Sequence, residues 1–181
     1  MGASQEQILI DKCCSGDSSA FGPLIQLYRR RLYSYLYKMC GEKTQAEDLF
    51  QETLIKVWGG IKKYSERQKF SSWLFAIAHN TAMDNLRSRE KRELISGIDP
   101  DEIKGSHDPY KELVNSETKV MIENAIGTLP AKQKNVFLLR VYGEVSFKEI
   151  SELTNEPVNT VLSHMHYSVK KLKNMIGKKN D

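Results

Sequence analysis

Residues 146–173 read SFKEISELTNEPVNTVLSHMHYSVKKLK and hold the strongest structural pattern of the chain. Ser146 and Glu149 have the spacing of a capping box, which predicts that a short helix begins here. Pro157 suits the first turn of a further helix, which we expect to continue to about Gly177. A short helix, a tight turn and a longer helix give the spacing of a helix-turn-helix. The stretch therefore predicts a small all-α unit.

The rest of the chain is also predicted to be helical, because apolar residues recur three and four positions apart and strand-like alternation is almost absent. Asp17 and Asp108-Pro109 are N-cap signals, and Thr44 with Glu47 forms a second capping-box pattern. From these signals we expect upstream helices over residues 4–14, 17–39, 44–58, 70–92, 108–127 and 130–142. The predicted fold class is all-α, with two small helical domains.

Charge and composition divide the 181 residues into three parts. Residues 93–107 lose helical periodicity and gain glycine, proline and acidic side chains, which is typical of a linker. We therefore expect a helical bundle over 1–92, an acidic linker running into the next helix over 93–119, and a second domain over 120–181. The net charge of +4 is small, but an acidic linker lies between two basic segments.

The sequence argues against several other classes of protein. The N-terminus has no run of apolar residues long enough for a signal peptide, and no later run approaches the length of a membrane span, so we expect a cytoplasmic protein with no membrane insertion. His164 and His166 are two positions apart and point to different sides of a helix, so we predict no metal site there. We predict no cofactor and no catalytic residues.

The helix expected from Thr44 carries a polar face opposite its apolar stripe. This face consists of Glu47, Asp48, Gln51 and Glu52. One interpretation is a solvated surface, with Glu47 serving as a cap. The other is an acidic docking surface for a basic partner, since opposite charge steers association. An enzymatic role for these carboxylates is disfavoured, because no histidine, second acidic pair or glycine-rich loop accompanies them.

Residues 64–92 mix aromatic and basic side chains in a way that suits single-stranded DNA. Aromatic rings can stack on unpaired bases while Lys and Arg follow the phosphates. Phe70, Trp73 and Ile77 have helical spacing and are better explained as core. The loop that contains Tyr64, Arg67 and Lys69 is the better candidate for base capture.

The last predicted helix has a polar face that can meet a DNA major groove. Its candidate contacts are Asn159, Thr160, Ser163, His164, His166, Tyr167 and Lys170. Val161, Met165, Val169 and Leu172 are expected to pack inward. Helix-turn-helix units also serve as protein-interaction modules, so the spacing alone leaves DNA binding and protein binding open.

Taken together, these segments resemble the sigma-70 family of bacterial RNA polymerase sigma factors, in particular the two-domain extracytoplasmic-function (ECF) group. QAEDLFQETLIKVW at 45–58 and KFSSWLFAIAHNTAMDNLRSR at 69–89 resemble region 2 of the family. IGTLPAKQKNVFLLRVYGEVSFKEISEL at 126–153 and PVNTVLSHMHYSVKKLK at 157–173 resemble region 4. The motifs occur in the family's order and cover nearly the whole chain.

The resemblance implies a promoter-specificity subunit with an all-α fold and no catalytic residues of its own. Its implied partners are core RNA polymerase, promoter DNA as duplex and as melted non-template strand, and an anti-sigma factor. Core polymerase would meet Glu47, Asp48, Gln51 and Glu52. The minus-ten element would meet Tyr64, Arg67, Lys69, Asn80 and Arg87, with Asp84 serving structure. The minus-thirty-five element would meet Asn159, Thr160, Ser163, His164, Tyr167, Lys170 and Lys171. The acidic linker would thread through the polymerase.

The chain departs from the group's usual pattern in its last helix, where Leu162, His164 and Tyr167 occupy positions that are customarily basic. Two alternatives therefore stand beside the promoter-specificity subunit: a sigma-like polymerase adaptor that recruits promoters weakly, and a stand-alone helix-turn-helix regulator. Before the turn, Thr154 replaces a usual hydrophobic residue. Asn155 stands where glycine is common, and asparagine tolerates the left-handed conformation.

Overall fold

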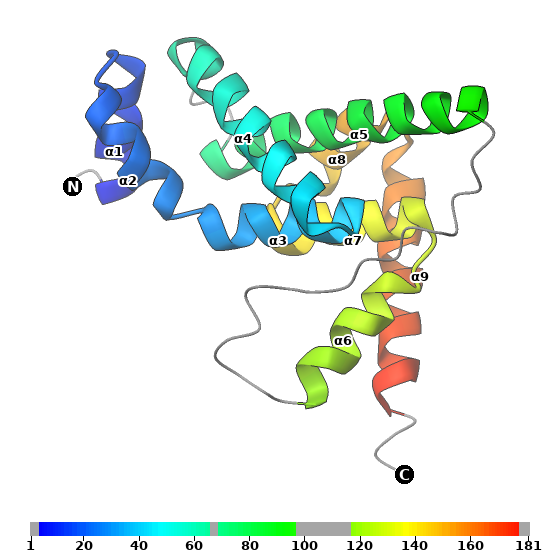
Figure 1. Ribbon diagram of the computed structural model, residues 1–181. Helices are drawn as coiled ribbons and strands as arrows, with labels where there is room; N and C mark the ends of the chain where they lie inside the picture. The colour runs from blue at the N-terminus through cyan, green and yellow to red at the C-terminus, as the bar shows by residue number, and fades with distance from the viewer. Residues whose placement is uncertain (1–3, 66–68, 97–116, 178–181) are drawn as a thin grey trace. The chain divides into compact units, whose positions relative to one another are not determined.

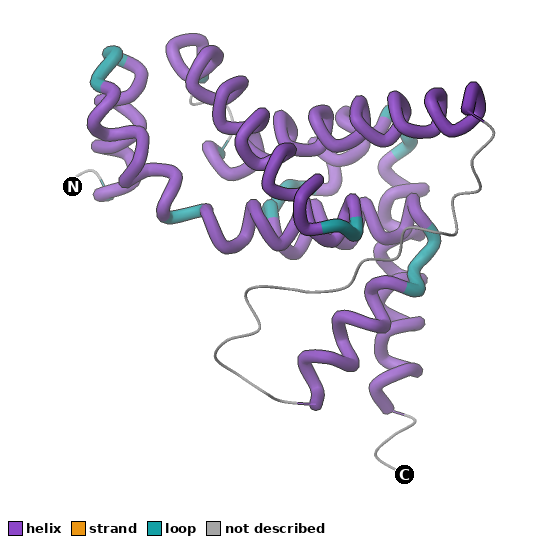
Figure 2. The backbone as a smooth tube through the Cα atoms, in the orientation of Figure 1, coloured by secondary structure: helices purple, strands orange, loops and turns teal. Residues whose placement is uncertain are grey.

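A computed structural model describes residues 4–65, 69–96 and 117–177. Throughout these ranges the secondary structure is helical, with short connections and no strand (Figures 1 and 2). The all-α prediction is therefore confirmed. The chain divides into two compact units, Met1–Gly105 and Ser106–Asp181, and each is described by itself.

The first unit is built on three helices that each contact the other two: α3 (Arg29–Cys40), α4 (Lys43–Gly60) and α5 (Phe70–Ser96). Its remaining elements are α1 (Gln5–Cys14), η1 (Ser18–Ala20), α2 (Phe21–Gln26) and η2 (Ile61–Lys63). The core of the three-helix packing consists of Leu32, Tyr35, Leu36, Leu49, Val57, Leu74, Phe75 and Ala78, all nearly free of solvent. Burying an aliphatic or aromatic side chain of this size contributes about 1.5–3 kcal/mol each.

The helix predicted over 17–39 is wrong, because the structure divides it into η1, α2 and α3. The amide of Leu27 bonds to the carbonyl of Leu24 at 3.3 Å, and that of Tyr28 bonds to Ile25 at 2.9 Å. These bonds span three residues instead of four, which tightens the chain and interrupts the α-helix. Asp17 caps only η1, through a 2.9 Å bond from the Ser19 amide.

The capping box predicted at Thr44 is also wrong. The structure starts α4 at Lys43, with Glu42 as an N-cap that makes no side-chain hydrogen bond. Glu47 instead lies 3.9 Å from Lys43 in an i, i+4 ion pair. The helical periodicity that places Leu49 and Val57 inside also predicts an inward Trp58, but this side chain is 36% exposed. At its far end α5 continues past the predicted Arg92 to Ser96.

The second unit is arranged around α9 (Val158–Gly177), which contacts α6 (Glu117–Gly127), α7 (Ala131–Tyr142) and α8 (Phe147–Thr154). Its core includes Ala125, Ile126, Leu129, Val136, Leu138, Leu139, Val145, Ile150, Val161 and Leu172. The prediction for α7 agrees within one residue, α8 begins directly after the predicted cap Ser146, and α9 ends at the predicted Gly177. The predicted cap at Asp108-Pro109 and most of the predicted linker lie outside the described residues.

Two local features predicted from the sequence fix the ends of α8, the first helix of the helix-turn-helix: a capping box at its start and Asn155 at its end. The Ser146 hydroxyl accepts from the Glu149 amide, and the Glu149 carboxylate accepts from the Ser146 amide, so the capping box is complete. Asn155 ends α8 in the left-handed conformation, at φ 55° and ψ 39°. A non-glycine residue rarely adopts this conformation, and asparagine is among those that tolerate it best.

Candidate nucleic-acid interface

The acidic docking surface of Glu47, Asp48, Gln51 and Glu52 lies on α4, and all four side chains are exposed. The opposite side of α4 buries Leu49, Thr53 and Val57 against the core. Two of the carboxylates are partly neutralised by i, i+4 partners, since Glu47 pairs with Lys43 and Glu52 lies 2.7 Å from Lys56. Asp48, between them, is the acidic group with the clearest access to a partner.

The segment between α4 and α5 is anchored by aromatic rings that pack edge-on or tilted against one another. Tyr64, half-buried, packs against Phe70 and Trp73 with ring centroids 5.5 and 5.3 Å apart, and Phe70 also contacts Tyr28 at 5.5 Å. Phe70 is buried, which confirms its core assignment. Lys69 is exposed, and Arg67 lies outside the described residues. The rings therefore fix both ends of the predicted base-capturing loop.

Tyr28 ties this aromatic cluster to the first helix. Its hydroxyl donates to the carboxylate of Glu6 on α1. Burial, and next the bond to Glu6, raises the pKa of Tyr28 well above its ordinary value, so the hydroxyl stays protonated as a donor. The aromatic anchor of the loop thus depends on α1.

The polar face of α5 presents Asn80, Asp84 and Arg87, all exposed. The spacings of four and three residues place them on one side of the helix. Arg87 Nη1 lies 3.7 Å from Asp84 Oδ1, with both side chains about two-thirds exposed or more, so the pair is weak and leaves Arg87 accessible. The opposite side of α5 buries Ala78 and His79.

His79 has a role that the sequence did not reveal. Its Nδ1 lies 3.2 Å from the hydroxyl of Tyr35 on α3, and both residues are buried. A buried polar group needs such a partner, because leaving it unsatisfied costs about 1–3 kcal/mol. The residues are 44 positions apart, so only the packing of α3 against α5 brings them together.

On α9 the predicted minus-thirty-five residues divide into two groups. Asn159, Ser163, Tyr167 and Lys170 are exposed, while Thr160, His164 and Lys171 are half-buried. The Lys171 ammonium donates to the carbonyl of Thr128 at 2.6 Å, beyond the end of α6. The exposed group forms the accessible face, whereas Lys171 fastens α9 to the α6–α7 connection.

Three charged or ionisable side chains meet at the turn of the helix-turn-helix. Glu156 Oε1 accepts from Lys132 Nζ at 2.7 Å, and its Oε2 lies 3.3 Å from His164 Nε2, an ion-pair distance without hydrogen-bond geometry. Lys132 belongs to α7 and His164 to α9. The sequence offered no signal for this cluster, since its members belong to three different segments: α7, the turn after α8, and α9.

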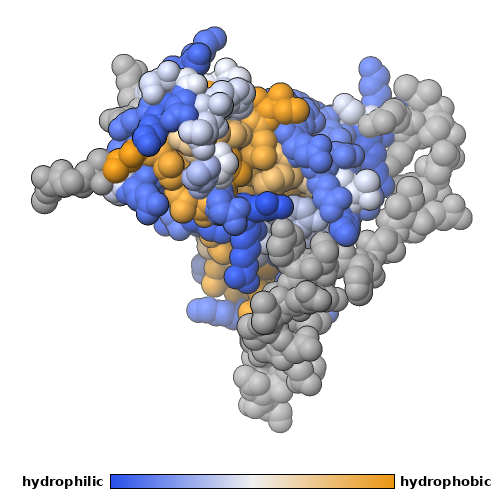
Figure 3. Space-filling view, turned by 60° about the vertical axis from the view of Figure 1, so that its left-hand side comes forward, coloured by the Kyte–Doolittle hydropathy of each residue, from blue (hydrophilic) through white to orange (hydrophobic). Residues whose placement is uncertain are grey.

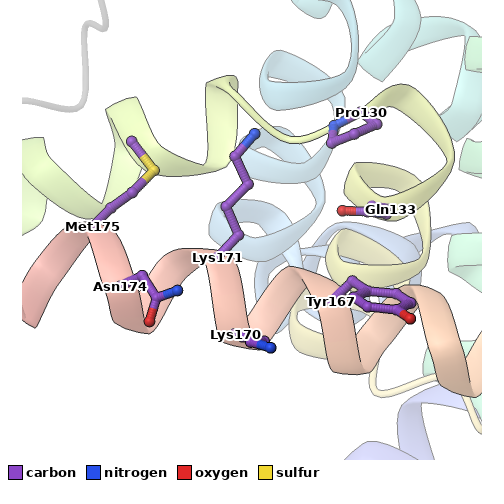
Figure 4. A pocket seen from close by; sticks show the side chains of 7 residues that line it. All are labelled: Pro130, Gln133, Tyr167, Lys170, Lys171, Asn174 and Met175. Atoms are coloured by element: carbon purple, nitrogen blue, oxygen red, sulfur yellow. The ribbon is translucent and has the colours of Figure 1, made fainter.

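A shallow groove of about 440 Å³ lies beside α9. Its lining consists of Pro130, Gln133, Tyr167, Lys170, Lys171, Asn174 and Met175. Figure 4 shows Lys171 extending from α9 toward the connection that leads to Pro130. The groove adds Gln133 and Asn174 to the polar side chains that the sequence assigned to this face.

The described part of the chain contains no helix with the length and hydrophobicity of a membrane span. The same residues hold no cluster of three or more His, Cys, Asp and Glu side chains that could bind a metal ion. Cys13, Cys14 and Cys40, all among the described residues, form no disulfide. Figure 3 shows apolar surface between hydrophilic side chains on the side where α1 and α2 come forward. Exposed apolar residues of the first unit include Ile8, Leu27 and Ile55.

The geometry defines a class of helical protein with two units. The first unit carries an acidic face on α4 and a polar face on α5, with an aromatic cluster between these helices. The second unit is a helix-turn-helix. The model of Sigma-70 region 2 matches residues 24–92, and that of Sigma-70 region 4 matches residues 119–172. Together these matches cover more than half of the chain. The chain therefore belongs to the sigma-70 family.

The relatives narrow this to the ECF group. The chain is 30% identical over 164 residues to the ECF RNA polymerase sigma factor SigW of Bacillus subtilis, which covers 83% of this chain and 86% of the relative. It is 27% identical over 180 residues to the ECF RNA polymerase sigma-E factor of Haemophilus influenzae. This alignment covers 94% of this chain and 95% of the relative. It is an ECF sigma factor, a promoter-specificity subunit of RNA polymerase.

Solved structures show the same fold. The sigma factor RpoE, in complex with the anti-sigma factor NepR from Bartonella quintana, matches with a TM-score of 0.69 and 20% identity, covering 87% of this chain and 96% of that one. CnrH, in complex with the cytosolic domain of CnrY, matches with a TM-score of 0.64 and 19% identity. This match covers 97% of this chain and 99% of CnrH.

Proposed function

We propose that the two units divide the work of promoter selection as the three predicted segments suggest: core docking and minus-ten capture over 1–92, a connecting linker over 93–119, and minus-thirty-five contact over 120–181. The observation that carries this proposal is the placement of two exposed polar helix faces, on α5 and α9, in separate units. One chain thereby offers two DNA-contact surfaces.

Core polymerase docks on Glu47, Asp48, Gln51 and Glu52 of α4 in this proposal. Support comes from the exposure of all four side chains on a helix whose other face is fixed in the core. A rigid, charged helix face suits a basic partner, because it needs no rearrangement to present its charge.

Minus-ten DNA is captured by the first unit as an unpaired strand. Tyr64, Arg67 and Lys69 belong to the loop between α4 and α5, and Asn80 and Arg87 extend the contact along α5. The aromatic cluster supports this role, since it holds the loop ends in place before DNA arrives. Base capture then shifts the duplex toward its melted state by binding energy alone.

Minus-thirty-five DNA meets α9 in this proposal. The predicted contacts are Asn159, Thr160, Ser163, His164, Tyr167, Lys170 and Lys171. The exposed Asn159, Ser163, Tyr167 and Lys170 make the direct contacts, while His164 and Lys171 lie against Glu156 and the Thr128 carbonyl. The N-terminal turns of α9 supply polar side chains that fit base edges. Lys170 lies farther along the helix, where a phosphate contact is the expected role.

An anti-sigma factor regulates the protein in this proposal. Two structures of similar fold are complexes with an anti-sigma factor or with the cytosolic domain of a second protein. The protein acts in the cytoplasm beside the polymerase, and catalysis stays with the core enzyme.

Run-off transcription tests the proposal. Purified chain is added to core polymerase with genomic promoter fragments at low salt, and the transcripts are compared with those of core alone. We expect defined start sites that depend on the chain. Equal transcription with and without the chain would overturn the proposed function.

A second candidate is the polymerase adaptor with weak promoter recruitment. The observation that favours it is the exposure of Leu162 and Tyr167, at 42% and 56%, at customarily basic positions. The adaptor predicts core binding without promoter-dependent initiation, so binding and transcription measured in parallel separate the two candidates.

A further inference from the structure

Glu156 presents a carboxylate at the entrance to α9, the helix that meets DNA in the proposed function. The side chain is only 15% exposed and faces two potential cations. The Lys132 side chain is 74% exposed and places its Nζ 2.7 Å from Oε1, while the His164 side chain is 20% exposed and places its Nε2 3.3 Å from Oε2. Both partners are thereby directed to a protein anion.

The turn holds this carboxylate in a fixed position. The Glu156 amide donates to the Ser151 carbonyl at 3.1 Å, and the Ser151 hydroxyl donates to the Glu156 carbonyl at 2.5 Å. Asn155, in the left-handed conformation, sets the direction of the chain just before it. These bonds fix the backbone of Glu156 at the turn, and the contacts with Lys132 and His164 orient its carboxylate.

The helix bearing His164 is fixed just as firmly. The hydroxyl of Ser168, which is fully buried, lies 2.8 Å from the carbonyl of His164 and 3.2 Å from that of Gln133 on α7. This shared donor locks α9 against the helix that carries Lys132. The backbones that carry Lys132 and His164 are therefore held at a fixed spacing.

The position of this cluster matters for DNA binding. Affinity for duplex phosphates rises with the number of cations that reach them, at about 0.9 in the slope of log K against log salt for each phosphate neutralised. A carboxylate that pairs with a lysine keeps that lysine from contacting a phosphate. Its own negative charge also repels phosphates. Here it does so beside the turn, where a helix-turn-helix approaches the duplex.

We propose that Glu156 is a positioning residue that keeps Lys132 and His164 turned toward the helix-turn-helix turn and thereby lowers the affinity of this unit for duplex phosphates. The inference rests on the proposed function, because it concerns how this unit meets DNA. Its effect is to weaken sequence-independent binding, which leaves promoter choice to the exposed residues of α9.

The test uses the full chain and a short mixed-sequence DNA duplex, because phosphate contacts do not depend on sequence. Fluorescence anisotropy gives the binding constant from about 50 to about 200 mM salt, the range in which such contacts are lost. Glu156→Gln keeps the size of the side chain and removes its charge. We expect its slope to steepen by about 0.9, with roughly three- to tenfold tighter binding at the lowest salt.

A double-variant cycle separates positioning from a structural effect. Lys132→Met alone should leave the salt slope unchanged, because in the native chain Lys132 faces Glu156 instead of DNA. In the Lys132→Met background, Glu156→Gln should lose most of its gain. If Glu156→Gln does not fold, Lys132→Met still decides the matter, since a shallower slope would show that Lys132 reaches phosphate in the native chain.

Glu152→Gln is the matched control, because Glu152 is an exposed acid of α8 in the same unit. Its loss should leave the slope unchanged. An equal steepening with Glu152→Gln, or an unchanged slope with Glu156→Gln, would overturn the inference. Failure of the transcription experiment does not decide this one, because the duplex titration contains no polymerase. A chain that does not bind the duplex even at low salt overturns this inference, while the proposed function is judged by transcription alone.

Discussion

Individual side chains in this sigma factor gain their roles from neighbours that are distant in sequence. His79 is a buried histidine, and its bond to Tyr35 depends on the packing of α3 against α5. Glu156 shows the same limit, because nothing near it in the sequence announces Lys132 or His164. Helical periodicity can place a residue on a buried or exposed face, but it cannot supply the partner across the interface.

Asp17 gives a prediction about pH at this scale. The hydroxyl of Ser19, and then its amide, donates to the Asp17 carboxylate and lowers the pKa of Asp17 below its ordinary value. A depressed pKa in the folded state means that the contribution to stability is present above the unfolded value, near 4, and is lost as the pH falls through the folded value. Asp17→Asn removes the titrating group but keeps a side chain that can cap.

Thermal unfolding of the native chain and Asp17→Asn from about pH 5 to about pH 3 measures this contribution. We expect the native chain to be the more stable at the upper end and the difference to shrink as the pH falls. A difference that stays constant over the range would contradict the assignment.

At the scale of single helices, caps and glycines decide where elements meet. A Cβ on Gly60, at the end of α4, would lie 3.3 Å from Cζ2 of Trp73 on α5, whereas one on Gly59 would meet nothing within 4 Å. Helix propensity alone favours alanine over glycine by up to about 1 kcal/mol at either position. We expect Gly59→Ala to gain part of this and Gly60→Ala to be about 1 kcal/mol less stable than Gly59→Ala.

Chemical denaturation compares the two variants, and Trp73 fluorescence in a Trp58→Phe background reports the local change. Gly60→Ala should alter the emission while Gly59→Ala should not. Equal stability and identical emission in both variants would show that the ring of Trp73 yields at no cost.

The helices of the second unit could be predicted closely, and those of the first only in part. Ser146, Pro157 and Asn155 are strong local signals, so the bounds of α8 and α9 follow from short-range physics. The break at Leu27–Tyr28 has no glycine or proline to mark it, and the structure shows it only as a switch to shorter hydrogen bonds. The pattern at Thr44 was misleading because α4 begins one residue earlier, at Lys43.

The recognition helix α9 supports a prediction about selectivity. Replacing Leu162, His164 and Tyr167 with Lys, Arg and Arg restores the customary charges. We expect the holoenzyme to bind DNA more tightly and to discriminate less between a selected promoter and a scrambled duplex, because phosphate contacts are blind to sequence. Binding constants for the two duplexes give the ratio. A large gain restricted to the promoter would instead support the adaptor.

The whole molecule carries a net charge of +4 that is spread unevenly among surfaces. The acidic docking surface of α4 is set against basic segments in the same chain, so its contribution to polymerase binding should depend on salt. Asp48→Lys is expected to weaken core binding by roughly tenfold at low salt and by less at high salt. Titration of labelled chain with core polymerase measures this.

Glu152→Lys provides the control, since it makes the same change in charge on α8 in the other unit. It should leave core binding nearly unchanged. If both variants lost affinity equally, net charge alone would govern association and the α4 surface would have no special role.

The contacts of α1 set a limit on how this protein can be divided. The match to region 2 begins at residue 24, yet α1 lies before it and supplies Glu6 to the Tyr28 hydroxyl and the Cys14 thiol to the carbonyl of Ile61 at 3.3 Å. A fragment cut at the boundary of the match would leave these two groups facing solvent beside an uncovered apolar surface. We therefore expect a fragment that begins at residue 24 to be less stable than one that includes α1, so comparative studies of isolated regions should retain this helix.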